Sequence, residues 1–252
     1  MADVYRFLRT PRWAVASSVV VALTVAFVNL GTWQLDRMQE RRLANEVDAA
    51  RLASEPAPLD ELIGSVGGDV ASLEYRRATV VGTFAPRLEA LVRSMTHGGE
   101  AGFHVLTPLQ TEAGTWVIVN RGWVPLEFDT PPVAASPPEG VVEIAGLARL
   151  GQTRSGVGPT DPPGARVVSR VDLEHLAASV DGPLAPVWLQ ASVPDGDLPI
   201  PVPEPDVADP GPHLSYAIQW FAFALIGVVG YGALVRSHAH RGQVGARRME
   251  VA

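Results

Sequence analysis

Two long runs without a charged residue, one near each end of the chain, constrain the fold more than any other feature. The first, Trp13–Leu30, has 18 residues and the second, Leu214–Val235, has 22. Each is close to the roughly 20 residues that a helix needs to cross the hydrocarbon core of a bilayer. We therefore predict transmembrane helices at 13–30 and 214–235, with buried core helices as the alternative.

The first run also has features of a cleavable signal peptide, because Arg6, Arg9 and Arg12 precede it. However, 18 residues is long for the apolar part of such a peptide, and no A-x-A cleavage pattern directly precedes Gly31. We therefore expect an uncleaved anchor.

The placement of arginine predicts the orientation of the second helix and is less decisive for the first, which Arg37, Arg41 and Arg42 follow. Two spans place both ends of the chain on the same side, so the second helix decides the orientation. Four arginines follow the second run: Arg236, Arg241, Arg247 and Arg248. Three acidic residues precede it: Glu204, Asp206 and Asp209. Because positively charged flanks stay in the cytoplasm, we expect both tails (1–12 and 236–252) to be cytoplasmic and residues 31–213 to lie outside. This places a multi-pass protein in the lipid bilayer of the cell membrane.

The long segment between the two runs is acidic. Residues 31–213 carry 13 arginines against 25 aspartates and glutamates. Nucleic-acid-binding proteins instead present a basic face to the phosphate backbone. We therefore expect no nucleic-acid partner.

The residue types that are missing exclude several further classes of site. The chain has no cysteine, which excludes disulfides, CxxC redox or metal sites and covalent haem attachment. It also has no lysine, so P-loop and Schiff-base chemistry are excluded. Since GxSxG, HExxH and GxGxxG motifs are absent as well, we do not expect an enzyme.

The segment between the two runs is predicted to be mainly β-structure. Residues 33–53 lack glycine and proline and should continue the first helix beyond the membrane. Short runs rich in β-formers, separated by Gly and Pro, follow it at Tyr75–Phe84, Ala90–Met95, Phe103–Leu109, Thr115–Arg121, Val141–Leu150, Arg166–Arg170 and Pro186–Ala191. One helix is expected at 172–180. The proline-rich residues 193–212 should form a stiff, extended connection that leads the chain back to the membrane. The predicted fold class is an α+β membrane protein, in which two transmembrane helices flank a small, mainly antiparallel sheet or open barrel with added helices.

Both apolar runs contain small residues at regular spacing. Ala14, Ser18, Ala22 and Ala26 recur every four residues in the first run, and Gly227, Gly230 and Ala233 every three in the second. Small residues allow close approach of helices in a membrane. The two helices could pack on each other through these residues, or on the helices of a partner.

Four segments together resemble the Surfeit-locus family of cytochrome c oxidase assembly factors. They are LGTWQLDRMQERR (Leu30–Arg42), YRRATVVGTF (Tyr75–Phe84), GFHVLTPL with VIVNRGWVP (Gly102–Leu109 and Val117–Pro125), and HLSYAIQWFAFA (His213–Ala224). Their order, spacing and topology match, and the resemblance covers nearly the whole chain.

The resemblance implies an accessory role in building the haem a-containing subunit of an aa3-type cytochrome c oxidase. For bacterial members it implies binding or delivery of haem a, with oxidase subunits as partners. The alternative is a structural accessory subunit that stays on a mature respiratory supercomplex without touching haem.

His213 is the candidate iron ligand, at the start of the second run. A neutral imidazole can ligate haem iron, and Tyr216 and Trp220 should share its helical face. The alternative is an interfacial histidine within an aromatic belt.

Trp33 and Arg37 follow the end of the first run. Trp33 could face Trp220, or simply anchor the helix at the interface. Arg37 could meet a haem propionate, because arginine suits carboxylates. A surface ion pair with Asp36 or Glu40 is the alternative.

Arg121 and Trp123 are the candidate partner-binding residues. Gly122 predicts a tight turn that would direct both side chains to one rim of the domain. Alternatively, Trp123 fills the core and Arg121 pairs with an acid.

Overall fold

The computed structural model describes residues 2–153, 160–192, 198–209 and 211–249. The chain divides into two compact units, which we describe separately. One comprises Met1–Glu46 with Val207–Ala252, and the other comprises Val47–Asp206.

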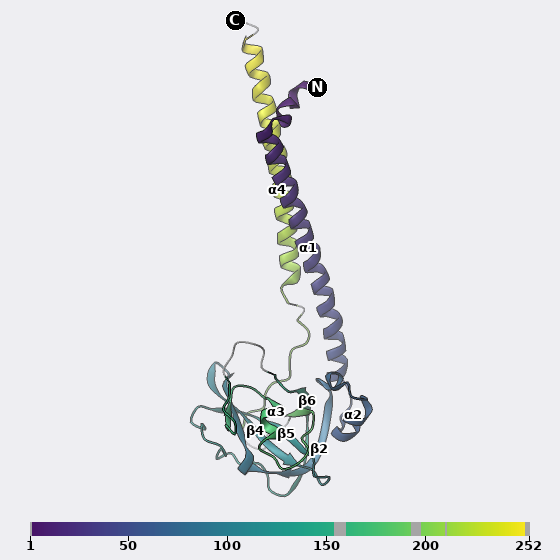
Figure 1. Ribbon diagram of the computed structural model, residues 1–252, viewed down its shortest axis with the longest axis vertical. Coiled ribbons are helices and arrows are strands. Elements are labelled where there is room, and N and C mark those ends of the chain that lie inside the picture. Colours follow the sequence, from purple (N-terminus) through teal and green to yellow (C-terminus); the bar gives the residue numbers. More distant parts are fainter. Residues whose placement is uncertain (1, 154–159, 193–197, 210, 250–252) are drawn as a thin grey trace. The chain divides into compact units, whose positions relative to one another are not determined.

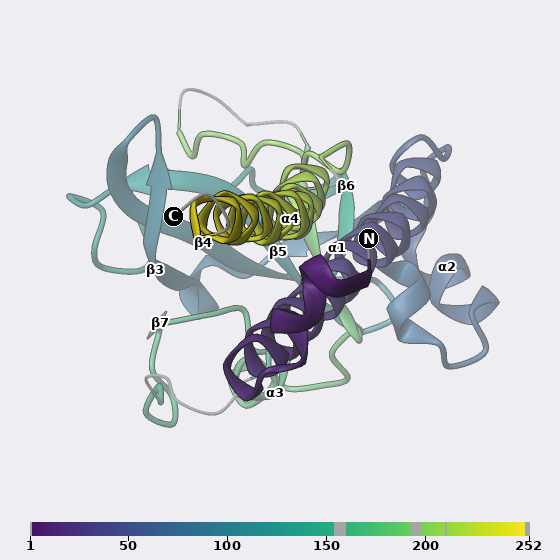
Figure 2. The same cartoon turned by 90° about the horizontal axis from the view of Figure 1, so that it is seen from above.

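The first unit consists of two long helices that run side by side in opposite directions (Figure 1), and Figure 2 shows them inclined to each other. After a short 3₁₀ helix, η1 (Ala2–Arg9), helix α1 spans Pro11–Leu52, and α4 spans His213–Met249. Two helices of the described chain, Pro11–Leu52 and His213–Arg241, are long and apolar enough to cross a membrane. The prediction that the first helix continues past Leu30 to about residue 53 is confirmed.

The small residues at regular spacing do not join these two helices. Ala14, Ser18, Ala22 and Ala26 are all exposed on α1, and the space beside Gly227 and Gly230 on α4 is open. Of the two alternatives that the sequence left open, packing of α1 and α4 on each other through these residues is not observed. The contact face consists of other residues, among them Gly31 and Phe27 on α1 and Trp220 and Phe221 on α4, and the exposed stripes stay available to another helix.

The second unit is built on an eight-stranded sheet in the order β1-β2-β6-β8-β5-β4-β3-β7. The strands are β1 (Ala57–Pro58), β2 (Arg77–Phe84), β3 (Ala90–His97), β4 (Glu100–Gln110), β5 (Trp116–Pro125), β6 (Val141–Leu150), β7 (Val167–Val168) and β8 (Val187–Ala191). The short helices are α2 (Leu59–Ser65), η2 (Val70–Leu73), η3 (Pro86–Leu88) and α3 (Leu173–Ala177). Because β2 also pairs with β4, strands β2, β6, β8, β5 and β4 close into a small barrel.

The barrel was predicted in outline but not in every element. The pairing is mainly antiparallel, with parallel contacts only at β1–β2, β3–β7 and β5–β8 among the described strands. The strand predicted at 166–170 contracts to β7, and the one predicted to end at Arg121 continues to Pro125. Both β1 and α2 are additions to the predicted set.

Alternation along the strands directs apolar side chains into the barrel. On β2, the even-numbered Ala78, Val80 and Phe84 are buried, whereas Val81 faces outward. The main core cluster gathers these side chains with others from β4, β5 and β8, including Leu109, Val119 and Leu189.

The proline-rich return is fastened to the domain. Ile200 exchanges two backbone hydrogen bonds with Trp123, at 2.6 and 2.8 Å. Gln190 donates to the carbonyl of Val202, and Arg77 pairs with Glu204 at 2.9 Å. Ile200 retains the backbone N–H that the surrounding prolines lack, so it can pair with Trp123 within the proline-rich segment. Residues 193–197 and 210 of that prediction lie outside the described chain.

Candidate functional site

His213 is the first residue of α4, and its imidazole lies against α1. Nδ1 of His213 is 2.8 Å from Oε1 of Gln34. Because an amide oxygen only accepts hydrogen bonds, Nδ1 carries the ring proton and donates the hydrogen bond to Oε1 of Gln34. The lone pair of the neutral ring is then on Nε2. A hydrogen bond of this type fixes the tautomer and orientation of histidines that bind metals.

Nε2 of His213 lies close to Gly211, two residues before it in the chain. Gly211 precedes the helix with a φ of +78°, and a Cβ built there would lie 3.6 Å from Nε2. Glycine adopts this left-handed conformation without steric cost. The ring nitrogen that could bind a metal is thus flanked by backbone.

Aromatic rings continue the same contact between α1 and α4. The ring of Trp220 stacks on Phe27 with centroids 5.6 Å apart and an interplanar angle of 25°. Phe223 meets both rings at about 6 Å. These rings provide a flat apolar surface two helical turns from His213.

Tyr216 and Trp33 lie away from this contact face. Tyr216 is 48% exposed, and the next residue, Ala217, is the one buried against α1. Trp33 is 56% exposed, and the ring partners of Trp220 are phenylalanines. The structure therefore joins His213 and Trp220 on one face, places Tyr216 beside it, and directs Trp33 outward.

Arg37 forms a surface ion pair with Glu40, which is the alternative to a haem propionate that was expected from the sequence. Its Nη1 lies 2.8 Å from Oε2 of Glu40, one helical turn away, and both side chains are more than half exposed. Exposed pairs of this type are worth roughly 0–1 kcal/mol. The guanidinium is therefore accessible and only weakly held.

Arg121 is buried in the barrel, as the extra residue of a β-bulge on β5. Val105 on β4 pairs with Gly122 and Leu106 pairs with Asn120, so Arg121 is the extra residue between these two pairs. Its guanidinium donates to Glu89 at 2.8 Å and to Thr107 at 2.8 Å. Arg121 is 7% exposed and Glu89 is fully buried. This geometry corresponds to the structural alternative, in which the arginine pairs with an acid.

Trp123 is also buried, with 4% of its surface exposed. A Cβ at Gly102 would lie 2.6 Å from its indole, and His97 stacks near it at 5.4 Å. The backbone of Ile200 passes directly over Gly122, whose φ is +137°. The N-R-G-W motif therefore builds the bulge and anchors the return segment, and little of either side chain remains for a partner.

The sequence interpretation missed three residues of the helix contact: Phe27, Gly31 and Gln34. They recur at intervals of four and three residues, which is the spacing of one helical face. That spacing is a usable signal only once the partner helix is known. Among the described residues, no group of three or more histidine, aspartate or glutamate side chains could hold a metal ion.

Sequence comparisons with known proteins find relatives over most of this chain. A sequence model described as the SURF1 family matches residues 21–225. An uncharacterised SURF1-like protein of Mycobacterium tuberculosis (strain ATCC 25618 / H37Rv) is 31% identical, covering 98% of this chain and 90% of the relative. A SURF1-like protein of Monosiga brevicollis is 31% identical over 91% of this chain and 89% of its own. Surfeit locus protein 1 of Homo sapiens is 28% identical over 82% and 73%.

Proposed function

Because the chain belongs to the SURF1 family, we propose that it is an assembly factor for an aa3-type cytochrome c oxidase, and that it holds haem a as cargo for the catalytic subunit. The family is linked to cytochrome oxidase assembly. The haem-handling step is our own proposal, and it depends on the helix contact around His213.

The observation that carries this proposal is the hydrogen bond from His213 to Gln34. It leaves Nε2 as the unprotonated nitrogen, which is the form that ligates iron. A histidine serving only as part of an interfacial belt does not need a fixed tautomer. The contact therefore favours a ligand over a passive anchor.

The surrounding residues suit the other parts of a haem. The rings of Trp220 and Phe27 offer apolar surface for the macrocycle, and exposed Tyr216 and Trp33 could cover its edges. Arg37 could exchange its weak pair with Glu40 for a propionate, since arginine binds carboxylates in bidentate fashion. All of these groups bind and orient, and none is proposed to react.

We place this site at the outer face of the cell membrane, with both termini in the cytoplasm. The arginine distribution supports this orientation. The partners are then oxidase subunits in the same bilayer, which would receive haem at the membrane surface.

The test is haem a content in purified full-length protein, from a host that makes haem a. We expect His213→Gly to lose the haem a absorption band and added imidazole to restore it, because imidazole can replace the missing ligand. His238→Gly is the matched control, since it removes a histidine near the other end of the same helix and should retain haem a. An equal haem a content in wild type and His213→Gly would refute the proposal.

A second candidate is a structural accessory subunit that stays on a respiratory supercomplex. The exposed small-residue stripes on α1 and α4 favour it, because they suit packing on a partner's helices. Stoichiometric recovery with mature oxidase, combined with no effect of His213→Gly on oxidase haem a, would support this candidate.

A further inference from the structure

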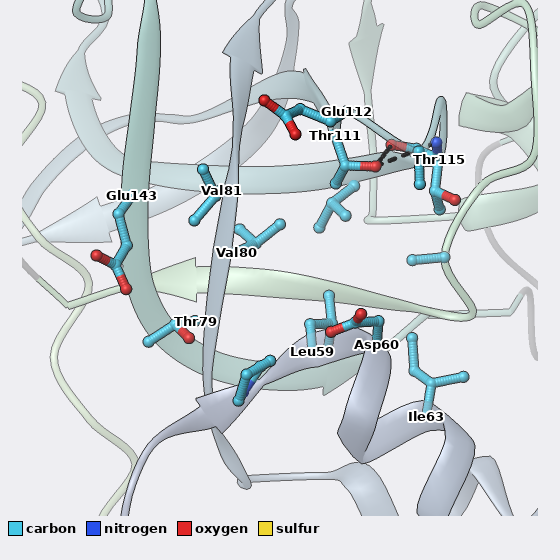
Figure 3. A pocket seen from close by; sticks show the side chains of 14 residues that line it. Leu59, Asp60, Ile63, Thr79, Val80, Val81, Thr111, Glu112, Thr115 and Glu143 are labelled. Atoms are coloured by element: carbon cyan, nitrogen blue, oxygen red, sulfur yellow. Dashed lines mark hydrogen bonds between the residues drawn. The ribbon is translucent and has the colours of Figure 1, made fainter.

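A groove of about 400 Å³ opens on the barrel domain, well separated in the chain from His213. Its walls are β2, the start of α2 and the turn between β4 and β5 (Figure 3). The volume is within the roughly 300–1,000 Å³ of typical ligand pockets. Two features of its lining indicate what it could bind. One is an edge of β2 without a partner among the described strands, and the other is a set of side chains that carry only negative charge.

The groove lies where one edge of β2 has no strand partner. β1 pairs with this edge at Ala78 and Thr79, and β4 pairs with it again at Thr83 and Phe84. On the opposite edge, β6 pairs with β2 continuously from Arg77 to Thr83. Within the described strands, the first edge is therefore interrupted between β1 and β4.

Val81 lies in this gap, where none of the described strands pairs with this edge of β2. The N–H of Ala85 donates to Pro108 on β4, whereas Ala148 on β6 donates to the carbonyl of Arg76. Backbone groups alternate in direction along a strand, so odd-numbered residues of β2 face the interrupted edge. The N–H and C=O of Val81 therefore point into the groove, and its side chain is 49% exposed.

The charged side chains of the lining are all carboxylates: Asp60, Glu112 and Glu143. Figure 3 shows them spread around Val80 and Val81, and Glu143 lies directly across from Val81 in the β2–β6 register. All three are exposed. In the described part of the chain, none of them has a salt-bridge partner within 4.0 Å. The groove thus combines an apolar floor with a negatively charged rim.

We propose that this groove binds an extended, cationic segment of a partner protein, which adds a short strand to the free edge of β2 at Val81. Pairing to the backbone of Val81 orients the segment, in the manner of peptides that add a strand to an exposed sheet edge. Alternate arginine or lysine side chains then meet the acidic rim, and the residues between them contact the apolar floor. This interaction is independent of haem binding at His213.

The two features together select this occupant. A helical partner has no free backbone groups for Val81, and an acidic segment would be repelled by the rim. A compact cation would satisfy the carboxylates but not the strand edge. Only an extended chain with positive side chains pairs with the strand edge at Val81 and also neutralises the carboxylates of the rim.

The test uses full-length protein in detergent and three labelled hexapeptides, followed by fluorescence anisotropy at fixed salt. The first peptide alternates valine and arginine, the second alternates valine and glutamate, and the third is the first with every backbone nitrogen methylated. N-methylation removes the backbone donors and keeps the charge. We expect the first peptide to bind at least tenfold more tightly than either of the others.

Variants then locate the binding. Glu143→Arg combined with Glu112→Arg should weaken the valine–arginine peptide at least tenfold, whereas Glu127→Arg, an exposed acid outside the groove, should not. Because the chain has no cysteine, Ala113→Cys can carry a single fluorophore at the rim that reports occupancy. No binding, equal loss in Glu127→Arg, or full binding of the N-methylated peptide would each overturn the proposal. The last result would identify a simple cation site instead.

Discussion

Gly31 on α1 and Phe221 on α4 meet where a side chain on α1 would not fit. A Cβ built on Gly31 would lie 2.6 Å from Cε1 of the Phe221 ring, and Gly31 is the only buried residue among those described on α1. The ring therefore packs directly on the α1 backbone. This contact lies one turn from Gln34, so it sets the distance at which Gln34 can reach His213.

We predict that Gly31→Leu separates the two helices and weakens haem binding. The added side chain must displace Phe221, and overpacking of this type costs about 1–3 kcal/mol. The Gln34–His213 hydrogen bond would then be lost. The measurement is haem a content and the thermal midpoint of the full-length protein, both of which should fall.

Ala22→Leu provides the matched control, because Ala22 is exposed on α1. The same leucine should leave the α1–α4 contact and haem a content unchanged. If it instead reduces recovery with oxidase, the exposed stripe would be a partner surface. Equal loss of haem a in both variants would refute the role assigned to Gly31.

Gln34 should act on haem through His213. Gln34→Leu removes the acceptor for Nδ1–H, and loss of such an outer partner typically weakens metal binding about 10- to 100-fold. Gln34→Glu retains an acceptor and should recover most of the affinity. Haem a titration measures the affinity, and resonance Raman of the iron–histidine stretch reports the ligand directly. A normal stretch and affinity in Gln34→Leu would show that Gln34 has no such role.

The long helix and most of the strands could be predicted from local sequence. β6 matches its predicted bounds, Val141–Leu150, because β-forming residues are bounded there by glycine turns. In contrast, β1 has two residues, one of them Pro58, and pairs with β2 about 20 residues away. Proline reads locally as a break, so only the tertiary pairing identifies that strand.

The candidate site could be predicted only in part, for a related reason. His213 is recognisable because it begins the segment His213–Ala224, one of the four that carry the family resemblance. Gln34 is chemically unremarkable, and its partner is 179 residues away. The register of the two helices, which no single segment contains, brings them together. The same holds for Glu89, whose pairing with Arg121 requires the bulge on β5.

The orientation across the membrane can be tested at a turn that tolerates insertion. Gly98 and Gly99 connect β3 to β4 with φ values of +58° and +87°, and a Cβ built on either would meet no other part of the described chain within 4 Å. We expect a reporter that is active only outside the cytoplasm to work when inserted there and to fail when fused after residue 252. Activity of the C-terminal fusion would reverse the proposed topology.

The ion pair between Glu89 and Arg121 should make a large contribution to the stability of the barrel domain. Glu89→Gln leaves a buried cation without its counter-charge, and breaking a buried pair in this way costs about 3–5 kcal/mol. Glu204→Gln makes the same chemical change in a pair whose acid is 48% exposed, and should cost at most about 1 kcal/mol. Urea unfolding followed by tryptophan fluorescence distinguishes them. Similar losses for both variants would contradict the buried-pair argument.

His104 should make the domain lose stability as the pH falls below neutrality. Its Nδ1 accepts a hydrogen bond from Nδ2 of Asn120 at 3.3 Å, and burial lowers the pKa of His104 from 6.5 to about 4. Between these two values the unfolded chain binds a proton that the folded chain does not. Unfolding near pH 5.2 should therefore take up about 0.9 proton at this residue, so stability declines from pH 6.5 towards 4.

The measurement compares wild type with His104→Gln, which retains a hydrogen-bonding side chain but does not titrate. Urea unfolding of the full-length protein at several pH values gives the slope of stability against pH. The wild-type slope should exceed that of His104→Gln by close to one proton near pH 5.2, and the two slopes should converge above pH 7. Parallel slopes over the whole range would mean that His104 is protonated as readily in the folded domain as in the unfolded chain.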